Sequence, residues 1–387
     1  MSGGRVVTGA ASLRPVAGGT DDIERLLDVF LAADDPAPLV VETSGSSGQA
    51  KQVALSARAL RASAAATLAR LGGAGQWVLA LPAHYVAGLQ VLTRSVLAGT
   101  TAVRLSDHDG LASAVNALAA DRRYLAAVPT QLHRWLAAAD ADSLAALASL
   151  DAVLLGGGAA SPVLLARARE RGVRVVTTYG MSETSGGCVY DGVALDGVAV
   201  ALGARGELRL AGPVLFDGYV GQPELTATVL RDGWLHTPDL GRFDADGRLV
   251  VLGRSDDVVV SGGVNVALPA VEARLQAMPG IGTVAVAARP DPEWGASIVA
   301  VLTGAGSTNG PATGTAVPSL AAVRDFVADE HPRSWAPREL VVVDALPMLA
   351  SGKVDRQQLS ALLDSSDSVT LEVSGAGRTN PEREERA

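Results

Sequence analysis

The sequence predicts an α/β protein with a large N-terminal domain and a small, mobile α+β C-terminal domain. Between residues 38 and 178, apolar runs of strand length alternate with helical stretches, which is typical of a mostly parallel sheet covered by helices. From Val189, short β-like runs are split by turn pairs such as Asp246-Gly247, which indicates an antiparallel, β-rich subdomain. After Asp257 helices and strands alternate again. We therefore expect a separate small unit there.

Helix boundaries in the large domain follow from residues that start and stop helices. Asp21-Asp22 begins a predicted helix over 21–33, and Ser56 caps one that ends at Gly72. Pro162 stands in the first turn of a helix over 161–171. The other elements predicted here are strands 38–42, 77–81, 101–105, 124–128, 151–155 and 174–178, and helices 88–97, 111–120 and 130–139.

The C-terminal half divides into a β-rich part without a long helix and the small domain. We predict the domain boundary at Asp256, which gives domains over 1–255 and 256–363 and a disordered, charged tail over 364–387. The loop over 304–318 is rich in small residues and is expected to be flexible. The predicted elements are strands 206–210, 214–219, 249–252, 282–287, 297–303 and 340–343, and helices 269–278, 320–330 and 356–363.

Composition restricts the class of protein. The chain has 387 residues, 48% of them hydrophobic, and 43 glycines, which fits a globular protein of two or three cores. It has no apolar run long enough to span a bilayer and no signal-peptide core, so we expect no membrane insertion and a cytoplasmic location. The single cysteine, Cys188, excludes an intrachain disulfide and a multi-cysteine zinc site. The net charge of −9 argues against non-specific nucleic-acid binding.

A loop of small residues follows the predicted strand 38–42 directly. Its glycines permit positive φ, successive N–H groups can form a concave anion nest, and its hydroxyls and lysine add donors and charge. Such a loop suits a polyphosphate, although a flexible linker has a similar composition. It is not a Walker A loop, because Ala50 and Gln52 stand where that motif needs glycine and Ser/Thr. The residues expected to bind phosphate are Thr43, Ser44, Gly45, Ser46, Ser47, Gly48 and Lys51.

This loop and the motifs after it resemble, in order, those of the adenylate-forming acyl-CoA ligase family, the superfamily of acyl-CoA synthetases, firefly luciferase and peptide synthetase adenylation domains. The resemblance covers residues 38–363. Ala50, Ser182 and Pro238 replace the family's proline, threonine and glycine. The matching segments after the loop are Pro82–Leu89, Leu154–Ala159, Thr178–Thr184, Trp234–Asp239, Gly253–Asp257, Ser261–Asn265 and Pro347–Arg356.

The resemblance implies a role for each matching residue. It places the adenine against Gly157, Gly158, Ala159, Thr178, Tyr179 and Gly180, and the ribose against Asp239 and Arg254. It gives Ser182 to the α-phosphate, Glu183 to Mg²⁺, and Lys353 to a catalytic bridge between the acyl carboxylate and the α-phosphate. It assigns His84 to the acyl pocket, Asp256 to a hinge, and Gly262 and Gly263 to the pantetheine tunnel.

The implied reaction joins a carboxylic acid to coenzyme A at the expense of ATP. Lysine and magnesium charges offset the repulsion between two anions while acyl-AMP forms, and the small domain then rotates to admit the thiol. The short N-terminal region and the stretches at 82–85, 128–132 and 154–159 look most like the branch that acts on o-succinylbenzoate in menaquinone biosynthesis. Thr130, Gln131 and Arg134 are candidates for binding its second carboxylate.

Several alternatives stay open at this point. The acid could be another aryl or medium-chain acid, or the acceptor a carrier protein instead of coenzyme A. A non-catalytic nucleotide-binding regulator is a more distant alternative, because the chain contains every charged residue that the reaction requires. Patterns in the sequence leave the oligomeric state open, with a homodimer among the possibilities.

Overall fold

A computed structural model of the chain describes residues 13–43, 51–138, 140–279, 281, 283–303, 317–349, 354–364 and 369–373. The chain forms two compact units, Met1–Leu252 with Met348–Lys353 and Gly253–Pro347 with Val354–Ala387. The predicted boundary at Asp256 stays a prediction. No helix within the described ranges is both long and apolar enough to cross a bilayer.

The first unit is built on a seven-stranded sheet. Five neighbouring strands, from β8 to β5, are parallel; β9 pairs antiparallel with β8, and β10 pairs antiparallel with β9. In spatial order the strands are β10 (Val193–Ala194), β9 (Gly186–Tyr190), β8 (Val175–Met181), β7 (Ala152–Leu155), β6 (Arg123–Ala127), β4 (Gln76–Leu79) and β5 (Val103–Arg104). The predicted parallel sheet is confirmed.

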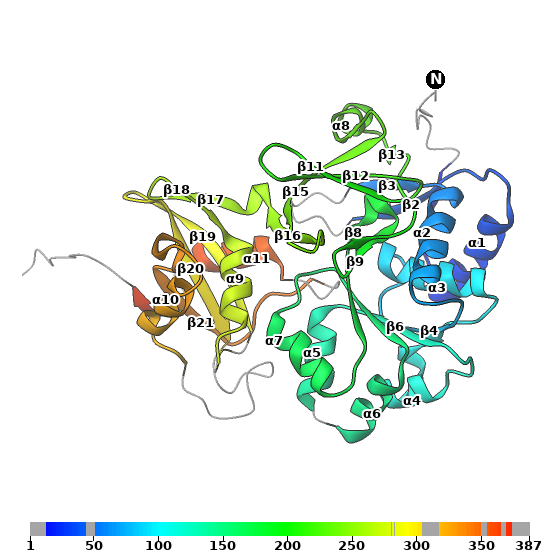
Figure 1. Cartoon of the computed structure of the whole chain (residues 1–387), viewed down its shortest axis with the longest axis horizontal. Helices are drawn as coiled ribbons and strands as arrows, with labels where there is room; N and C mark the ends of the chain where they lie inside the picture. Colours follow the sequence, from blue (N-terminus) through cyan, green and yellow to red (C-terminus); the bar gives the residue numbers. More distant parts are fainter. Residues whose placement is uncertain are drawn as a thin grey trace, which may run out of the picture. The chain divides into compact units, whose positions relative to one another are not determined.

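Helices cover both faces of this sheet (Figure 1). Alternate strand residues belong to different cores: Trp77 and Leu79 of β4 lie in one core and Val78 in the other, as the two-residue period of a strand requires. On the first face lie α1 (Thr20–Ala32), α2 (Ala57–Arg70) and α3 (Val86–Ala98); on the second lie α4 (Leu111–Asn116), α5 (Pro129–Ala138), α6 (Ala141–Ser149) and α7 (Pro162–Glu170).

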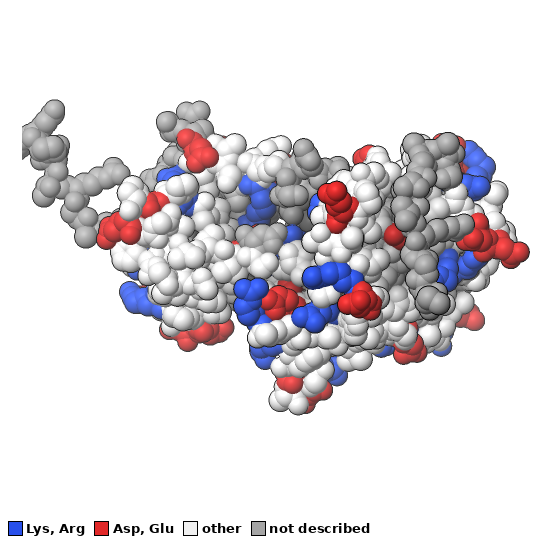
Figure 2. All heavy atoms as spheres, turned by 90° about the horizontal axis from the view of Figure 1, so that it is seen from above, with Lys and Arg blue, Asp and Glu red and all other residues white. Residues whose placement is uncertain are grey.

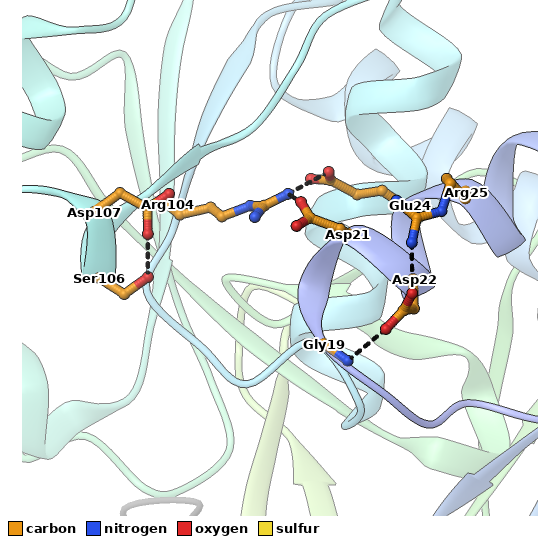
Figure 3. Close-up of polar contacts among 8 residues, drawn as sticks. All are labelled: Gly19, Asp21, Asp22, Glu24, Arg25, Arg104, Ser106 and Asp107. Atoms are coloured by element: carbon orange, nitrogen blue, oxygen red, sulfur yellow. Dashed lines mark hydrogen bonds and ion pairs between the residues drawn. The ribbon is translucent and has the colours of Figure 1, made fainter.

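Polar contacts tie α1 to the edge strand β5 (Figure 3). Arg104 of β5 donates to Asp21 and, at 2.6 Å, to Glu24. The hydrogen bond and charge of Arg104 lower the pKa of Asp21. At the start of the helix, the Asp22 carboxylate accepts from the Gly19 N–H at 3.1 Å and so caps it. The edge strand is thereby covered by charged side chains.

Two smaller sheets complete the first unit and confirm the predicted β-rich subdomain. The first consists of β1 (Arg14–Pro15), β2 (Leu39–Glu42), β3 (Gln52–Leu55) and β13 (Gly218–Tyr219). The second is antiparallel and consists of β11 (Ala199–Leu202), β12 (Glu207–Ala211), β15 (Trp234–Phe243), β14 (Leu230–Arg231) and β16 (Leu249–Arg254). Two helices were not predicted from the sequence: α6 and the short helix α8 (Pro223–Val229).

The second unit contains a two-stranded and a four-stranded sheet. The hairpin is β17 (Val258–Ser261) and β18 (Val264–Ala267). The larger sheet packs its Val, Ile and Leu side chains against α9 and α10. Its order is β19 (Val284–Asp291), β20 (Gly295–Thr303), β21 (Glu339–Val343) and β22 (Val369–Val373), and the helices are α9 (Leu268–Gln276), α10 (Leu320–Ala328) and α11 (Arg356–Asp364).

The prediction of a disordered tail over 364–387 is wrong for Val369–Val373. This segment forms β22, which pairs antiparallel with β21. It alternates β-branched or apolar residues with polar ones, a pattern that suits a strand at the edge of a sheet. Residues 365–368 and 374–387, and most of the loop predicted over 304–318, lie outside the described residues.

Candidate functional site

The residues singled out from the sequence follow the carboxyl ends of neighbouring parallel strands. His84 follows β4, Thr130 follows β6, Gly157 follows β7, and Glu183 follows β8. Strands β8, β7, β6 and β4 are adjacent and parallel, so these four segments come to one edge of the sheet. In open parallel sheets this edge is where ligands bind.

The order in which strands are added to the sheet reverses between β4 and β6. It leaves β4 toward β5 on one side and later returns to β6 on the other, so the loops after β4 and β6 diverge. The Gln131 side chain joins the two loops: its amide donates to the carbonyl of Ala80 at 2.7 Å and accepts from the N–H of Val128 at 3.0 Å. Gln131, predicted as a contact for the acid, therefore also joins the loops that follow β4 and β6.

His84 and Arg134 point to solvent at this edge. His84 lies in a tight turn before α3, where its ring contacts Tyr85 with centroids 4.3 Å apart, and both His84 and Arg134 are exposed. The turn needs Gly88, because a Cβ there would lie 2.2 Å from the carbonyl oxygen of Pro82. Thr130 is half-buried at the start of α5.

The glycine segment after β7 leaves an open surface. Gly157 adopts a φ of +78°, which favours glycine, and residues 157 to 159 are exposed. A Cβ added to Gly158 would meet no atom within 4 Å. At Gly156 the space is already filled, because a Cβ would lie 2.3 Å from the Thr178 hydroxyl oxygen. This arrangement leaves room for a planar ring beside Gly158.

Glycine at position 180 is required by the packing of β8 on β9. The pairing shifts register between Tyr179 and Gly180, and a Cβ on Gly180 would lie 2.1 Å from the carbonyl oxygen of Gly186. Just beyond β8 the chain forms a single 3₁₀ turn, Ser182–Thr184. The Thr184 hydroxyl closes this turn by bonding to the backbone of Met181.

Tyr179 and Asp239 form one hydrogen-bonded pair. The Tyr179 hydroxyl donates to Asp239 Oδ2 at 2.6 Å. Burial first, and the negative charge of Asp239 second, raise the pKa of Tyr179, so the phenol stays protonated. Asp239 is 8% exposed, and its N–H donates to Thr237 Oγ1, whose hydroxyl in turn donates to Leu208 O. The carboxylate is therefore held in a fixed position.

Glu183 and Lys51 both contact Tyr219. The Tyr219 hydroxyl donates to Glu183 Oε1 at 2.7 Å, and Lys51 Nζ lies 5.3 Å from the centre of the Tyr219 ring. Lys51 also closes the neck of the predicted phosphate loop: its N–H donates to Thr43 Oγ1 at 3.1 Å and its carbonyl accepts from the Thr43 N–H at 2.9 Å. A cation and a carboxylate therefore flank a single aromatic ring.

Other predicted residues belong to the second unit or lie outside the described residues. Arg254, Gly262 and Gly263 belong to the second unit, where the two glycines form the β17–β18 turn with φ of +58° and +78°. Asp256 stands in a 3₁₀ turn over Ser255–Asp257. Ser44, Gly45, Ser46, Ser47, Gly48 and Lys353 lie outside the described residues.

Tyr219 and Thr237 were not predicted as site residues. Tyr219 had been assigned only to a strand, because its partner Glu183 lies 36 positions earlier in the chain. Thr237 stands two residues before Asp239 in the same strand, so its side chain points to the same face. That spacing was the available signal for Thr237; no local signal was available for Tyr219.

Charged side chains of one sign do not gather into a large patch on the described part of the face shown in Figure 2. On the face shown in Figure 2, basic and acidic side chains are interspersed among the described residues, without an extended patch of either sign. Within the described ranges, no three His, Cys, Asp or Glu side chains are grouped to hold a metal ion. Glu183 is thus a single carboxylate, which suits an ion that takes its other ligands from phosphate and water, as Mg²⁺ does.

Comparison with known proteins gives two family matches. Residues 17–220 match the model of the AMP-binding enzymes, and residues 270–353 match that of the AMP-binding enzyme C-terminal domain. A probable 2-succinylbenzoate–CoA ligase from Mycobacterium tuberculosis is 44% identical over 333 residues, which cover 84% of each chain. The 2-succinylbenzoate–CoA ligase of Listeria monocytogenes is 29% identical over 83% of this chain and 69% of its own.

Solved structures share the fold. The o-succinylbenzoate CoA synthetase (MenE) of Bacillus subtilis, in complex with the acyl-adenylate intermediate OSB-AMP, matches with a TM-score of 0.70 and 28% identity, over 83% of this chain and 68% of that one. The same enzyme in complex with ATP and a magnesium ion matches with a TM-score of 0.69 and 27% identity, over 83% and 69%. The predicted fold class is confirmed by this similarity.

Proposed function

The chain belongs to the AMP-binding enzyme family, and we propose that it is an AMP-forming ligase that activates 2-succinylbenzoate as its acyl-adenylate and transfers the acyl group to coenzyme A in the cytoplasm. The M. tuberculosis relative, 44% identical over 84% of each chain, supports this acid. The arrangement of polar groups at the carboxyl edge of the sheet supports the chemistry.

The observation that carries the proposal is the position of the lysines. The chain has 32 basic side chains, and only Lys51 and Lys353 are lysines; all the others are arginines. An ammonium is a compact charge on a flexible stem, whereas a guanidinium is a planar fork, so the two are not interchangeable where a phosphate oxygen must be approached closely. Both lysines fall at positions where the ligase reaction needs a mobile point charge.

In the adenylation step two anions must meet. Lys51 offsets phosphate charge at the neck of the loop, Glu183 offers a carboxylate to the magnesium ion of Mg·ATP, and Lys353 neutralises charge between the acid and the α-phosphate. A correctly placed charge of this kind lowers the barrier by about 3 kcal/mol. When bound, magnesium supplies further neutralisation of the polyphosphate. The loop donors for the departing pyrophosphate are Thr43, Ser44, Gly45, Ser46, Ser47 and Gly48.

The Tyr179–Asp239 pair, which joins β8 to β15, would hold the nucleoside. Asp239, held by Tyr179 and Thr237, would accept hydrogen bonds from the ribose hydroxyls, with Arg254 as a second ribose contact. The adenine would lie on the open backbone at Gly157 and Gly158. Its other contacts would be Ala159 and the β8 residues Thr178, Tyr179 and Gly180. Ser182 would donate to the α-phosphate.

The acid would occupy the crevice between β4 and β6. His84 would lie near its reacting carboxylate, and Thr130 and Arg134 near the second carboxylate. Gln131 already uses both ends of its amide to join Ala80 and Val128, so its role is to shape the crevice. In the thioester step, Gly262 and Gly263 would line the path of the pantetheine and Asp256 would act as the hinge.

A panel of acids tests the proposal. Pyrophosphate release and thioester formation would be measured with 2-succinylbenzoate, benzoate and octanoate, each with and without coenzyme A. We expect pyrophosphate release to depend on 2-succinylbenzoate, and a 2-succinylbenzoyl thioester to form only when coenzyme A is present. The Lys353→Ala variant serves as the control for contaminating ligase. A clear preference for benzoate or octanoate would reject the acid, and no thioester with coenzyme A would reject the acceptor.

A further inference from the structure

We propose that Tyr219 is a positioning residue that keeps the Lys51 ammonium and the Glu183 carboxylate apart and oriented for Mg·ATP. This inference rests on the proposed function and extends it to a residue outside the recognised motifs. Tyr219 touches both charged groups, through its hydroxyl on one side and its ring on the other.

The two contacts use different parts of the side chain. The hydroxyl donates to Glu183 Oε1 at 2.7 Å, a distance typical of a charge-assisted hydrogen bond. Lys51 Nζ lies 5.3 Å from the ring centre, within the range of a cation–π contact. Because Tyr219 is only 5% exposed, solvent does little to weaken either contact.

The tyrosine backbone is fixed by the strand that follows Lys51. Tyr219 lies opposite Val53 in the pairing of β13 with β3. The N–H groups on either side of it donate to β3: Asp217 to Ala54 and Val220 to Gln52, both at 2.9 Å. Tyr219 is therefore joined by backbone hydrogen bonds to the strand that directly follows Lys51.

Phe216 supports the Tyr219 ring, and Thr226 supports its backbone. Phe216 packs edge-on against it, with ring centres 5.0 Å apart and an interplanar angle of 67°. The Thr226 hydroxyl accepts from the Tyr219 N–H at 2.9 Å. The Phe216 N–H also donates to the Glu183 carbonyl at 2.9 Å, so the backbone of Glu183 is joined to the same segment. Tyrosine, lysine and glutamate are thus parts of one supported unit.

This arrangement prevents Lys51 and Glu183 from forming a direct ion pair. A direct Lys51–Glu183 ion pair would leave neither group available for its ligand, since each would neutralise the other. A phenol is neutral and so does not offset the charge of a carboxylate. With Glu183 Oε1 accepting one hydrogen bond, Oε2 retains lone pairs for a metal ion. The ring holds the ammonium weakly enough to release it to a phosphate.

The test compares Tyr219→Phe with a matched control. Tyr219→Phe removes the hydroxyl and keeps the ring, and Tyr124→Phe removes another buried hydroxyl, one that donates to the carbonyls of Leu71 and Gly73. We expect Tyr219→Phe to raise the Mg²⁺ concentration for half-maximal acyl-AMP formation about tenfold, as removal of a residue that orients a metal ligand typically does. The KM for the acid and thioester formation from pre-made acyl-AMP should not change. Tyr124→Phe should keep the wild-type Mg²⁺ dependence.

A binding measurement makes the test independent of turnover. With Mn²⁺ in place of Mg²⁺, electron paramagnetic resonance reports the affinity for Mn·ATP, and we expect a loss of about tenfold in Tyr219→Phe. In a Glu183→Gln background the same substitution should have no further effect, because Tyr219 acts through that carboxylate. A Tyr219→Leu variant, which also removes the ring, should in addition raise the KM for ATP.

The outcomes separate this inference from the proposed function. Wild-type Mn·ATP affinity in Tyr219→Phe, or an equal loss in Tyr124→Phe, would reject the role of Tyr219. Additive losses in the Glu183→Gln background would also reject it, since they would show that the tyrosine acts on something else. Absence of acyl-AMP with every acid in the wild-type protein would reject the proposed function, while the Mn·ATP measurement would still decide the role of Tyr219.

Discussion

The Tyr179 hydroxyl donates a 2.6 Å hydrogen bond to the Asp239 carboxylate, which joins the last parallel strand of the large sheet to the long strand β15 of the antiparallel sheet. Removing one member of such a buried pair costs more than removing both, because the remaining polar group loses its partner. The two residues therefore allow stability and nucleotide binding to be separated.

Asp239→Ala should lower the free energy of unfolding by about 1–3 kcal/mol and abolish measurable ATP binding. The double variant with Tyr179→Phe should recover part of the stability but none of the binding, since no unpaired phenol remains. Urea unfolding and titration calorimetry with ATP measure the two effects. A double variant whose stability loss equals the sum of the single losses would show that the pair is not coupled.

Lys353→Ala should reduce acyl-AMP formation by at least about a hundredfold, which is the range for removal of one transition-state charge. Thioester formation from pre-made acyl-AMP should be almost unchanged. Rapid-quench assays of the two half-reactions measure this, with Lys353→Arg as the variant that keeps the charge. We expect Lys353→Arg to remain impaired as well; equal loss of both half-reactions in Lys353→Ala would contradict a role confined to adenylation.

Substitutions at Gly158 should change ligand binding without changing the fold. A Cβ at this position meets no atom within 4 Å, so Gly158→Ala and Gly158→Trp should unfold at the wild-type temperature while the Kd for ATP rises with side-chain size. Calorimetry and thermal unfolding follow the two quantities. Gly156→Ala is the contrasting variant: its Cβ would crowd the Thr178 hydroxyl and should lower the unfolding temperature. Unchanged ATP affinity in Gly158→Trp would remove the adenine from this surface.

Cys188 should resist alkylation in the folded protein. Burial raises the pKa of its thiol to about 12, so almost no thiolate exists near neutral pH. Iodoacetamide at about pH 8 should leave the native protein unmodified and should alkylate it fully in concentrated guanidinium chloride, where the thiol has its ordinary pKa of about 8.5. Because the folded pKa is the higher one, the stabilising contribution exists below the unfolded pKa and is lost as the pH rises toward 12. Full alkylation without unfolding, read by mass spectrometry, would contradict this burial.

Arg94→Met should leave stability unchanged or raise it. Arg94 is 4% exposed, burial lowers its pKa, and its Nε and Nη1 have no hydrogen-bond partner among the described residues. Well-packed apolar replacements of such buried charges are often neutral or stabilising. Arg61→Met is the control, because Arg61 donates to the carbonyls of Leu31 and Ala33 and its loss should destabilise. A fall of more than about 2 kcal/mol in Arg94→Met, measured by urea unfolding, would show that its guanidinium is satisfied.

Much of the fold could be predicted from apolar runs and from the residues that start and stop helices. The apolar runs of strand length, such as the one that begins at Trp77, and the helix stop at Gly72 gave strands and helices close to those in the structure. Helix α6 was missed although Asp140 caps it by accepting from Asp142 and Ser143, because it follows α5 after a very short break. Strand β22 was missed because the charged composition of the whole tail was taken as the signal, and the five alternating residues of the strand were not.

Several predicted site residues that the structure brings together are near neighbours in the sequence. Tyr179, Gly180 and Glu183 stand in one short segment, and Asp239 is preceded by its own support, Thr237. The Tyr219–Glu183 contact could not be read, because it depends on which strand pairs with β3, and strand pairing between distant segments is a property of the whole fold. The double use of the Gln131 amide was hidden for the same reason.

Because the only native thiol is sealed in the core, the protein needs no prior removal of cysteine before dyes or spin labels are attached elsewhere. Ser106 in the first unit and Ser360 in the second are both exposed, and each differs from cysteine by a single atom. A doubly labelled Ser106→Cys, Ser360→Cys protein would report, by energy transfer in solution, how the separation of its two halves changes as each substrate is added.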